Sequence, residues 1–407
     1  MKPRVLLING SIYLPGEGGY KRTRYLFNMM KEQGYDVTLL TSDFNHYAKK
    51  QRDVQKFRQE YPECKDIEMI HVAPYTKNIS IKRWYSGKMW YRGATRWVKE
   101  HYHNFDIVYG CMPDDTIKRI DGFCHKNGLK IVVDIRDLWP EVFRVLLKKE
   151  WIYRIITYPM KRRVNSCYAA ADELVAVSNE YLQRGLQVNT KSKNPLAVYI
   201  GAIFDKFYKG VEEFAPYIDK KEGETWVSYA GTLGSTYDLY TLMDAAEAIQ
   251  KTGRDHIIFK IIGQGPECEN LKQYVANKNI GNVDFVGFVE YEKMAAYLSK
   301  SDMTINSVKR RASQSIINKV ADYFAAGVPC LNGSSCQEMR DLIVDYQAGL
   351  NFEPEDVDSL VNAILKMDSE KELAVLFGNN AKRLAKEKFD RSVTYPQIIR
   401  LLDSLME

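Results

Sequence analysis

The stretch WVSYAGTLG at residues 226–234 decides the fold, because a short apolar run is followed at once by a turn with two glycines. A similar order occurs near the N-terminus, where the apolar residues 5–8 are soon followed by the turn PGEGG at 15–19. Continuous apolar runs suit strands that helices cover on both faces of a parallel sheet. A glycine-rich turn after the first strand of such a sheet lets the backbone approach a phosphate. For either turn alone, a glycine that only permits a tight turn is the alternative, but the pair favours two doubly wound α/β domains with a shared ligand.

Short β-branched runs alternate with longer helical patterns after each of these starts, which is typical of parallel sheets with crossover helices. The strands expected in the first half are Val5–Asn9, Val37–Thr41, Glu68–Val72, Ile107–Tyr109, Lys130–Asp134, Glu173–Val177 and Leu196–Ile200. Those expected in the second half are Trp226–Ala230, Ile257–Ile262, Val283–Val286, Met303–Asn306, Pro329–Leu331 and Leu350–Phe352.

The segment 201–224 is interpreted as the linker, because it lacks apolar periodicity and carries Gly, Pro and acidic residues. We therefore expect an N-terminal domain over residues 1–204 and a C-terminal domain over residues 205–386. The last stretch, 387–407, contains a helix that we expect to pack back on the N-terminal domain.

The composition limits the class of protein. The 407 residues suffice for two domains, and 45% apolar with 27% charged residues disfavours disordered, collagen-like and multi-span membrane proteins. Seven cysteines, none in a Cys-x-x-Cys pair, disfavour a disulfide framework or a zinc knuckle and favour a reducing cytoplasm. No apolar run approaches the roughly 18–20 residues that span a bilayer.

The most informative stretch is SQSIINKVADYFAAGVP at residues 313–329. Ser313 or Ser315 is expected to cap a helix, and Gly327 to end it in a left-handed conformation. Lys319 and Asp322 are three residues apart and hence on one face of that helix. A functionally silent surface ion pair is one interpretation. The other is a nucleotide clamp, with Lys319 and helix-start amides on a pyrophosphate and the Asp322 carboxylate on a ribose diol.

With this stretch, the motifs along the chain resemble those of retaining glycosyltransferases of family 4, especially the bacterial polysaccharide branch. The run Lys-x-x-Asp-Tyr-x-Ala-Ala-Gly-x-Pro over 319–329 is similar to the donor-site helix of that family. The other matching segments follow in order along nearly the whole chain, at residues 18–19, 34–38, 134–141, 171–173, 177–178, 229–231, 263–266 and 282–287.

The resemblance implies a GT-B fold, in which two Rossmann-like domains face each other across a cleft. It also implies transfer of a sugar from a nucleotide diphosphate sugar, most often a UDP-sugar, to an acceptor hydroxyl with retention at the anomeric carbon. A leaving diphosphate oxygen would take the acceptor proton, so that neither a cofactor nor a metal is expected. The catalytic task is then to stabilise the charge that grows on the diphosphate.

The resemblance also implies roles for individual residues. Lys319 and the turn amides would hold the diphosphate, Asp322 would hold the ribose, and Asp137 would orient the acceptor or the donor sugar. The expected catalytic residues are Asp137, Lys319 and Gln314. The expected donor-binding residues are Gly18, Gly19, Gly231, Thr232, Gly234, Gly263, Gly265, Val286, Phe288, Ser315, Lys319 and Asp322.

The acceptor side is expected to include His46, which follows the second strand, and Arg136, as a possible ion-pair partner of Asp137. The carboxylates of Asp134 and Asp137 at the end of one strand could suggest a metal site. A Lewis-acid site normally needs more oxygen ligands than these, so we expect no metal.

Two departures from the family pattern keep alternatives open. Gln314 stands eight residues before Asp322, where the family usually has a Glu, and Gln cannot carry charge. A cation pair that often follows the first strand of the second domain is also missing, with Thr232 and Tyr237 in that region. The stretch 309–311, Lys-Arg-Arg, could supply a cation, although such runs are commonly solvated. A non-catalytic GT-B partner subunit and a GT-B sugar-nucleotide epimerase are therefore kept as alternatives.

The positive charge is concentrated in two aromatic-rich stretches. Residues 77–103 carry seven Lys or Arg and one acidic residue, and residues 144–168 carry the same numbers. Aromatic core residues beside a solvated cationic face are one explanation, and no RNA-binding motif supports a nucleic acid partner. Interfacial membrane helices have this composition. We expect a cytoplasmic protein, peripheral on the inner face of the cell membrane, which meets an anionic surface and a polyprenyl-diphosphate-linked glycan acceptor.

Overall fold

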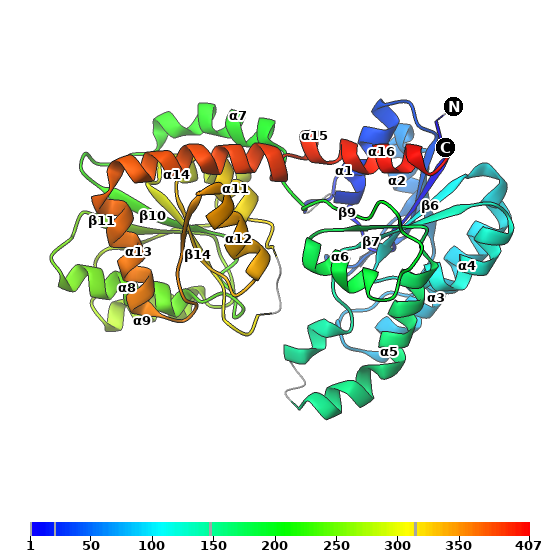
Figure 1. Ribbon diagram of the computed structural model, residues 1–407, viewed down its shortest axis with the longest axis horizontal. Coiled ribbons are helices and arrows are strands. Elements are labelled where there is room, and N and C mark those ends of the chain that lie inside the picture. Colours follow the sequence, from blue (N-terminus) through cyan, green and yellow to red (C-terminus); the bar gives the residue numbers. More distant parts are fainter. Residues whose placement is uncertain (1, 20–21, 146–148, 313–315) are drawn as a thin grey trace. The chain divides into compact units, whose positions relative to one another are not determined.

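The computed structural model describes residues 2–19, 22–145, 149–312 and 316–407. The chain forms two compact units, Met1–Val198 with Tyr395–Glu407 and Tyr199–Thr394 (Figure 1). These boundaries differ from the expected 204/205 and 386/387. The reason lies in the second unit, where the Tyr199 ring stacks on Phe389 with centroids 4.9 Å apart and Ala202 pairs with Asp390 in a β-bridge. The chain segments around residues 199–202 and 389–390, which lead from one unit to the other, therefore belong to the second unit.

The first unit contains a seven-stranded parallel sheet in the order β5-β2-β1-β6-β7-β8-β9. Its strands are β1 (Val5–Ile8), β2 (Val37–Ser42), β5 (Ile67–Ile70), β6 (Ile107–Met112), β7 (Lys130–Ile135), β8 (Glu173–Ala176) and β9 (Leu196–Ala197). The seven predicted strands are confirmed. A separate antiparallel hairpin, β3 (Phe44–Asn45) and β4 (Lys50–Gln51), was not predicted, because each strand is only two residues long.

The helices of the first unit are α1 (Arg22–Glu32), α2 (Val54–Glu60), α3 (Ile81–His101), α4 (Thr116–Lys126), α5 (Glu150–Ala170), α6 (Asn179–Leu186) and α16 (Pro396–Ser404). The helix α3 begins where the Ser80 side chain accepts a hydrogen bond from Arg83 N. The helices α3, α4 and α5 are neighbours in one layer. Tyr395 and Leu402 of the last stretch share a core cluster with Val5 and Leu7, so this end of the chain is built into the first unit.

The second unit contains a six-stranded parallel sheet in the order β12-β11-β10-β13-β14-β15. Its strands are β10 (Thr225–Ala230), β11 (Ile257–Ile262), β12 (Val283–Gly287), β13 (Met303–Ser307), β14 (Cys330–Gly333) and β15 (Gly349–Asn351), as predicted to within two residues. Its helices are α7 (Phe204–Phe214), α8 (Leu239–Lys251), α9 (Cys268–Asn277), α10 (Tyr291–Lys300), α11 (Val320–Ala325), α12 (Gln337–Tyr346), α13 (Val357–Ser369), α14 (Lys371–Leu384) and α15 (Arg391–Thr394). Tyr229 and Ala230 at the end of β10 belong to different core clusters, as expected for a sheet covered on both faces.

The prediction of a linker over 201–224 was wrong, because α7 occupies half of it. Phe204, Phe207 and Val211 are spaced three and four residues apart and pack in the core cluster that also contains residues of α10. Gly210 allows the close approach of the two helices, since a Cβ there would lie 2.5 Å from Glu292 Cα. The acidic and glycine residues that suggested a linker belong instead to a helix with one apolar face.

Within the part of the chain that the structure describes, no helix is both long enough and apolar enough to cross a membrane.

Candidate functional site

Two glycine turns meet at the carboxyl edge of the sheet in the second unit. The turn after β10 and the turn after β11 are joined by backbone hydrogen bonds, from Gly231 N to Ile262 O (2.8 Å) and from Leu233 N to Gln264 O (3.0 Å). Gly263 has a φ of +139°, and a Cβ there would lie 2.0 Å from Gly231 O. Only glycine permits this backbone contact, so Gly231 and Gly263 lie together as expected for one ligand site.

The Lys319 side chain lies against the first of these turns. Its Nζ donates a hydrogen bond to the Tyr229 hydroxyl (2.7 Å) and lies 3.9 Å and 3.7 Å from the ring centroids of Tyr229 and Tyr237. A Cβ on Gly231 would lie 3.1 Å from the same nitrogen. Burial lowers the pKa of Lys319 well below its usual value. Lys319 therefore lies beside the glycine turn, as predicted, although the two are about 90 positions apart in the chain.

Asp322 contacts a different tyrosine. Its Oδ1 accepts a hydrogen bond from the Tyr291 hydroxyl (2.7 Å) at the start of α10. Burial raises the pKa of Asp322 to about 6, although the Tyr291 hydroxyl and the charge of Arg391 act in the opposite direction. The interpretation as a surface ion pair is therefore wrong, because Lys319 and Asp322 each have their own partner. Among the described residues, the one hydrogen bond recorded for this carboxylate is to Oδ1, so its second oxygen could accept from a ligand.

The helix α11 is shorter than the sequence suggested. It begins at Val320, and Lys319 is the residue at its N-cap. The predicted caps Ser313 and Ser315 lie outside the described residues. Gly327 ends the helix with a φ of +75°, which confirms its predicted left-handed conformation. The predicted site residues Gln314 and Ser315 lie outside the described residues.

The remaining predicted residues of the second unit surround the same two turns. Thr232 is exposed and Gly234 partly buried. Gly265 packs so closely that a Cβ would lie 2.3 Å from Leu233 O. Val286, near the end of β12, is partly buried, and Phe288, just beyond it, is 63% exposed. Val286 lies within the last two residues of β12, and the others follow strands that end at this edge of the sheet.

Of the basic run 309–311, Lys309 lies near the glycine turn after β10, whereas the Arg310 side chain points elsewhere. Lys309 N donates to Thr236 O (3.2 Å), so its backbone lies beside the turn after β10. The Arg310 guanidinium donates instead to Pro354 O (2.8 Å), ahead of α13. Lys309 is therefore the member of this run that could supply a second cation.

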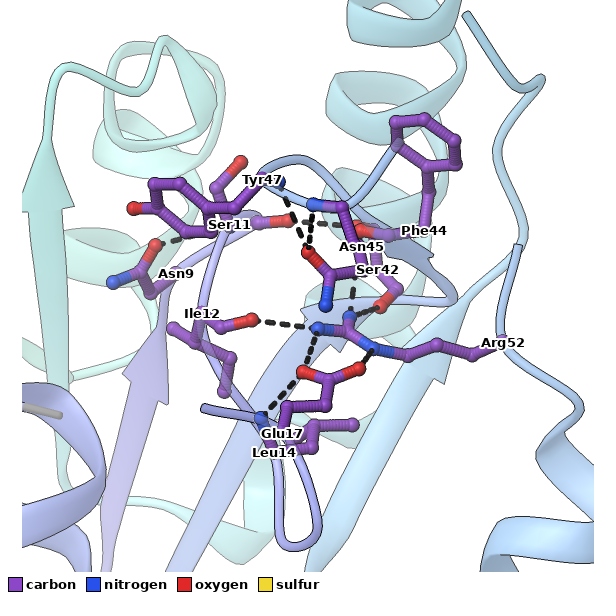
Figure 2. A network of polar contacts seen from close by, with 12 residues as sticks. Asn9, Ser11, Ile12, Leu14, Glu17, Ser42, Phe44, Asn45, Tyr47 and Arg52 are labelled. Carbon is purple, nitrogen blue, oxygen red and sulfur yellow. Dashed lines mark hydrogen bonds and ion pairs between the residues drawn. The ribbon is translucent and has the colours of Figure 1, made fainter. Parts of the chain in front are cut away.

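In the first unit, the loop at residues 10–19 is tied to the end of β2 by a network around Arg52 (Figure 2). The Arg52 guanidinium donates to both carboxylate oxygens of Glu17 (2.8 Å each), to Ile12 O (2.6 Å) and to Ser42 O (2.7 Å). Glu17 also accepts from Leu14 N (2.8 Å). Burial alone would raise the pKa of Glu17, but Arg52 and the Leu14 amide hold it below its usual value. The network fixes the loop that carries the predicted residues Gly18 and Gly19, both of which are exposed.

Glu17→Gln should destabilise the first unit, because it removes the charge that Arg52 contacts. At pH 7 we expect the free energy of unfolding to fall by about 1–3 kcal/mol, the range for hydrogen bonds to charged groups. Since the folded pKa of Glu17 lies below its unfolded value, this stabilisation is present above the unfolded pKa and is lost as the pH falls. Thermal unfolding at pH 7 and pH 3 measures it. Glu60→Gln, which removes an exposed pair with Lys56, is the matched control. An equal effect of both variants at pH 7 would contradict the assignment.

Arg136 has a different partner from the one expected. Its Nε donates to Asp134 (2.8 Å) and its Nη1 to the Thr23 hydroxyl (2.6 Å), so its ion-pair partner is Asp134 and not Asp137. Asp134 is fully buried and also receives two hydrogen bonds from Arg22 (3.2 Å each). Two guanidinium groups therefore neutralise one buried carboxylate. Asp137, by contrast, is exposed at the end of β7.

His46 contacts the Tyr75 hydroxyl through Nδ1. Burial, together with the charges of Lys49 and Arg83, lowers the pKa of His46 to about 4. The imidazole is therefore neutral near pH 7. Among the described residues, no group of three or more His, Cys, Asp and Glu side chains is placed to hold a metal ion.

Several residues of the site could not be identified from the sequence. They are the buried or partly buried partners of predicted residues, namely Arg22, Arg52, Tyr229, Tyr237 and Tyr291. Only one weak indication of them is present in the sequence. Tyr229 and Tyr237 flank the predicted glycine turn, but tyrosines at such positions are commonly ordinary core residues.

Comparison with known proteins agrees with this geometry. Residues 210–384 match the family model described as "Glycosyl transferases group 1". The match covers less than half of the chain, and it shows that this segment is similar to glycosyl transferases of group 1. The matched segment contains both glycine turns, Lys319 and Asp322.

Two curated relatives and one solved structure extend the likeness. The chain is 21% identical over 411 residues to the uncharacterized glycosyltransferase MJ1069 of Methanocaldococcus jannaschii, covering 100% of both. It is 23% identical over 150 residues to the putative colanic acid biosynthesis glycosyl transferase WcaI of Escherichia coli, covering 36% of each. Anabaena HepE, solved in complex with UDP, matches with a TM-score of 0.70 at 13% identity and covers 98% of this chain and 100% of HepE. The α/β fold with two Rossmann-like domains, matching GT-B glycosyltransferase structures, is confirmed.

Proposed function

We propose that the protein is a retaining glycosyltransferase that moves a sugar from a nucleotide diphosphate sugar, most simply a UDP-sugar, to an acceptor hydroxyl. The observation that carries this proposal is the Lys319 ammonium, which lies against the Gly231 turn with Asp322 three residues further on. A cation beside a glycine turn suits a diphosphate, and an acidic residue suits a ribose diol. The glycosyl transferases group 1 match and the UDP complex of HepE support the same class of donor.

In this mechanism the residues of the second unit bind the donor. The amides of Thr232 and Gly234 and the Lys319 ammonium hold the diphosphate, while Asp322 accepts hydrogen bonds from the ribose. Gly231 contributes its close backbone approach, because its own amide donates to Ile262 O. The wall formed by Gly263, Gly265, Val286 and Phe288 receives the base. Ser315 and Gln314 would reach the diphosphate and the donor sugar. These groups act mainly by stabilising charge on the leaving diphosphate.

The reaction itself needs no further co-reactant. The bond between the anomeric carbon and the diphosphate oxygen breaks, and a bond from the acceptor oxygen to the same carbon forms on the same face. The acceptor proton passes to the leaving diphosphate oxygen, so we propose no metal and no cofactor. In the first unit, Gly18 and Gly19 are proposed donor-binding residues of the loop that Arg52 fixes, Asp137 would orient the acceptor or the donor sugar, and His46 and Arg136 would lie on the acceptor side.

A transfer assay separates this function from the two alternatives. A panel of nucleotide sugars is incubated with the full chain, with and without a polyprenyl-diphosphate-linked glycan, and free nucleoside diphosphate is measured. Release that needs the acceptor supports transfer. Conversion of the sugar without an acceptor favours an epimerase, and binding of no nucleotide at all favours a non-catalytic partner subunit.

The proposed acceptor is a lipid-linked glycan on the cytoplasmic face of the cell membrane, reached from an anionic surface. Two helices of the first unit that both contact α4 expose large apolar side chains near their N-termini. In α3 these are Ile81 (83% exposed) and Trp84 (61%), and in α5 they are Trp151 (64%) and Ile155 (67%). The start of α3 lies beside the loop that carries His46, because Lys49 Nζ donates to Asn78 Oδ1 (2.5 Å), two residues before the N-cap Ser80.

Cations accompany these apolar side chains. The Lys88 ammonium lies 3.6 Å from the centroid of the Trp84 ring. Further along α3, a groove is lined by Arg92, Arg96, Lys99 and Arg119 of α3 and α4, with Glu100 as its acidic residue. Apolar side chains beside Lys and Arg are the chemistry of a helix that lies in the headgroup region of an anionic bilayer. We therefore propose a peripheral membrane protein and no nucleic acid partner.

Membrane binding should depend on both the apolar side chains and the charge. We expect the full chain to pellet with vesicles that contain phosphatidylglycerol, and 1 M salt to reduce the bound fraction at least tenfold, because each Lys or Arg near such a surface contributes about 1 kcal/mol that salt screens. The double variant Trp84→Ala/Trp151→Ala should also bind at least tenfold less. Tyr217→Ala, at an 85% exposed aromatic of the second unit, is the control. Undiminished pelleting in 1 M salt, or equal binding by both variants, would refute the docking face.

A further inference from the structure

Lys319 is held between two tyrosine rings. The centroids of the Tyr229 and Tyr237 rings are 6.1 Å apart with an interplanar angle of 68°, and the ammonium lies 3.9 Å and 3.7 Å from them. Tyr229 is fully buried, and its hydroxyl accepts from Lys319 Nζ while it donates to Thr232 O (2.9 Å). The hydroxyl thereby connects the cation to the backbone of the glycine turn. Tyr237 closes the other side, since its backbone N donates to Gly234 O (3.1 Å).

These contacts restrict a side chain that is otherwise mobile. A lysine carries about 2 kcal/mol of rotamer entropy, which a ligand would have to offset in order to fix it. An ammonium over an aromatic face gains about 0.5–2 kcal/mol from the ring. Burial lowers the pKa of Lys319, and no carboxylate of the described residues acts against that effect. A bound diphosphate would therefore supply the negative charge that favours the protonated form of this nitrogen.

We propose that Tyr229 and Tyr237 form an aromatic cage that positions the Lys319 ammonium for the second phosphate of the donor. This inference rests on the proposed function. It assigns two positioning residues in the region after β10, where the family often has two cations. At position 237 this chain has an aromatic ring in place of a cation, and the ring fixes the Lys319 ammonium. Asp322, which contacts Tyr291, lies outside this cage.

Binding of UDP and UMP separates a role in positioning the cation from a general role in folding the turn. Tyr237→Leu removes the ring, whereas Tyr237→Phe keeps it. We expect Tyr237→Leu to weaken UDP binding about tenfold and UMP binding less than twofold, because the cage acts on the second phosphate through a cation–π contact. Tyr237→Phe should stay within about threefold of the native protein for both nucleotides. Equal losses for UDP and UMP, or no loss of UDP binding in Tyr237→Leu, would overturn the proposal.

A readout without nucleotide tests the cage independently of the proposed function. In protein labelled with ¹³C-lysine, the Cε–Hε signal that disappears in Lys319→Arg is expected to be shifted by the rings in the free protein. Tyr237→Leu should move this signal toward the position of exposed lysines, and Tyr237→Phe should not. A shifted Lys319 signal in a protein that binds no nucleotide would support the cage and contradict the donor site. An unshifted signal in a protein that binds UDP would reject the cage alone.

Discussion

Lys319→Met is expected to lower kcat/KM for sugar transfer by about 10²–10³-fold, the usual cost of removing one preorganised donor from a developing negative charge. The ammonium lies beside the Gly231 turn, where the leaving diphosphate would gain charge as the glycosidic bond breaks. Methionine keeps most of the length of the side chain, so the packing against Tyr229 and Tyr237 is largely retained. Steady-state release of nucleoside diphosphate with a saturating acceptor measures the effect.

The control for this variant is Lys272→Met, at an exposed lysine of the same unit that pairs with Glu269. We expect its kcat/KM to stay within twofold of the native value. A Lys319→Met protein with a native melting temperature and less than threefold loss of activity would show that the diphosphate does not bind at this turn.

Asp322→Asn should remove the pH dependence of donor binding. Because burial raises the pKa of Asp322 to about 6, the native carboxylate is largely ionised at pH 7.5 and protonated at pH 5. If the ionised form accepts the ribose hydroxyls, the affinity for UDP should fall about tenfold per pH unit below pH 6. The variant should bind UDP at least tenfold more weakly at pH 7.5 and show a flat profile. Calorimetric titration from pH 5 to 8 measures both, and an unchanged profile in Asp322→Asn would contradict the assignment.

The same carboxylate should cost the protein stability. A carboxyl group whose folded pKa is raised favours folding when protonated, so its contribution becomes unfavourable as the pH rises through the unfolded pKa toward 6. At pH 7.5 Asp322→Asn is therefore expected to raise the free energy of unfolding by on the order of 1–2 kcal/mol, with little change at pH 4. A gain in stability with a loss of binding is the pattern of a functional group. A less stable variant at pH 7.5 would point to a structural role.

Much of the fold could be predicted because buried parallel strands leave a simple trace in the sequence. Apolar runs such as Ile257–Ile262 are covered on both faces and have few polar interruptions. The linker prediction failed at α7 because Gly210 and the acidic residues on its exposed face obscured the spacing of Phe204 and Phe207. The start of α11 was placed too early, because serine is a frequent N-cap but does not specify which helix it caps.

The candidate site was predictable only in its backbone and its charges. The glycine turns could be recognised because they follow strands, and Lys319 because it stands three residues before Asp322 in a helical stretch. The partners of the charged groups could not, because they depend on contacts between distant segments. Tyr229 and Lys319 are brought together by the pairing of β10 with β13, and Arg52 reaches Glu17 through a hairpin of two-residue strands. No local pattern of the sequence encodes either contact.

The central claim is a nucleoside diphosphate site in the second unit, and titration of the full chain with UDP, GDP, ADP and dTDP tests it most directly. We predict that one of them, most simply UDP, binds to a single site and that Lys319→Met weakens this binding at least tenfold while a control titration of Lys272→Met is unchanged. Binding of none of the four nucleotides, or equal affinity in the native protein and Lys319→Met, would contradict the account.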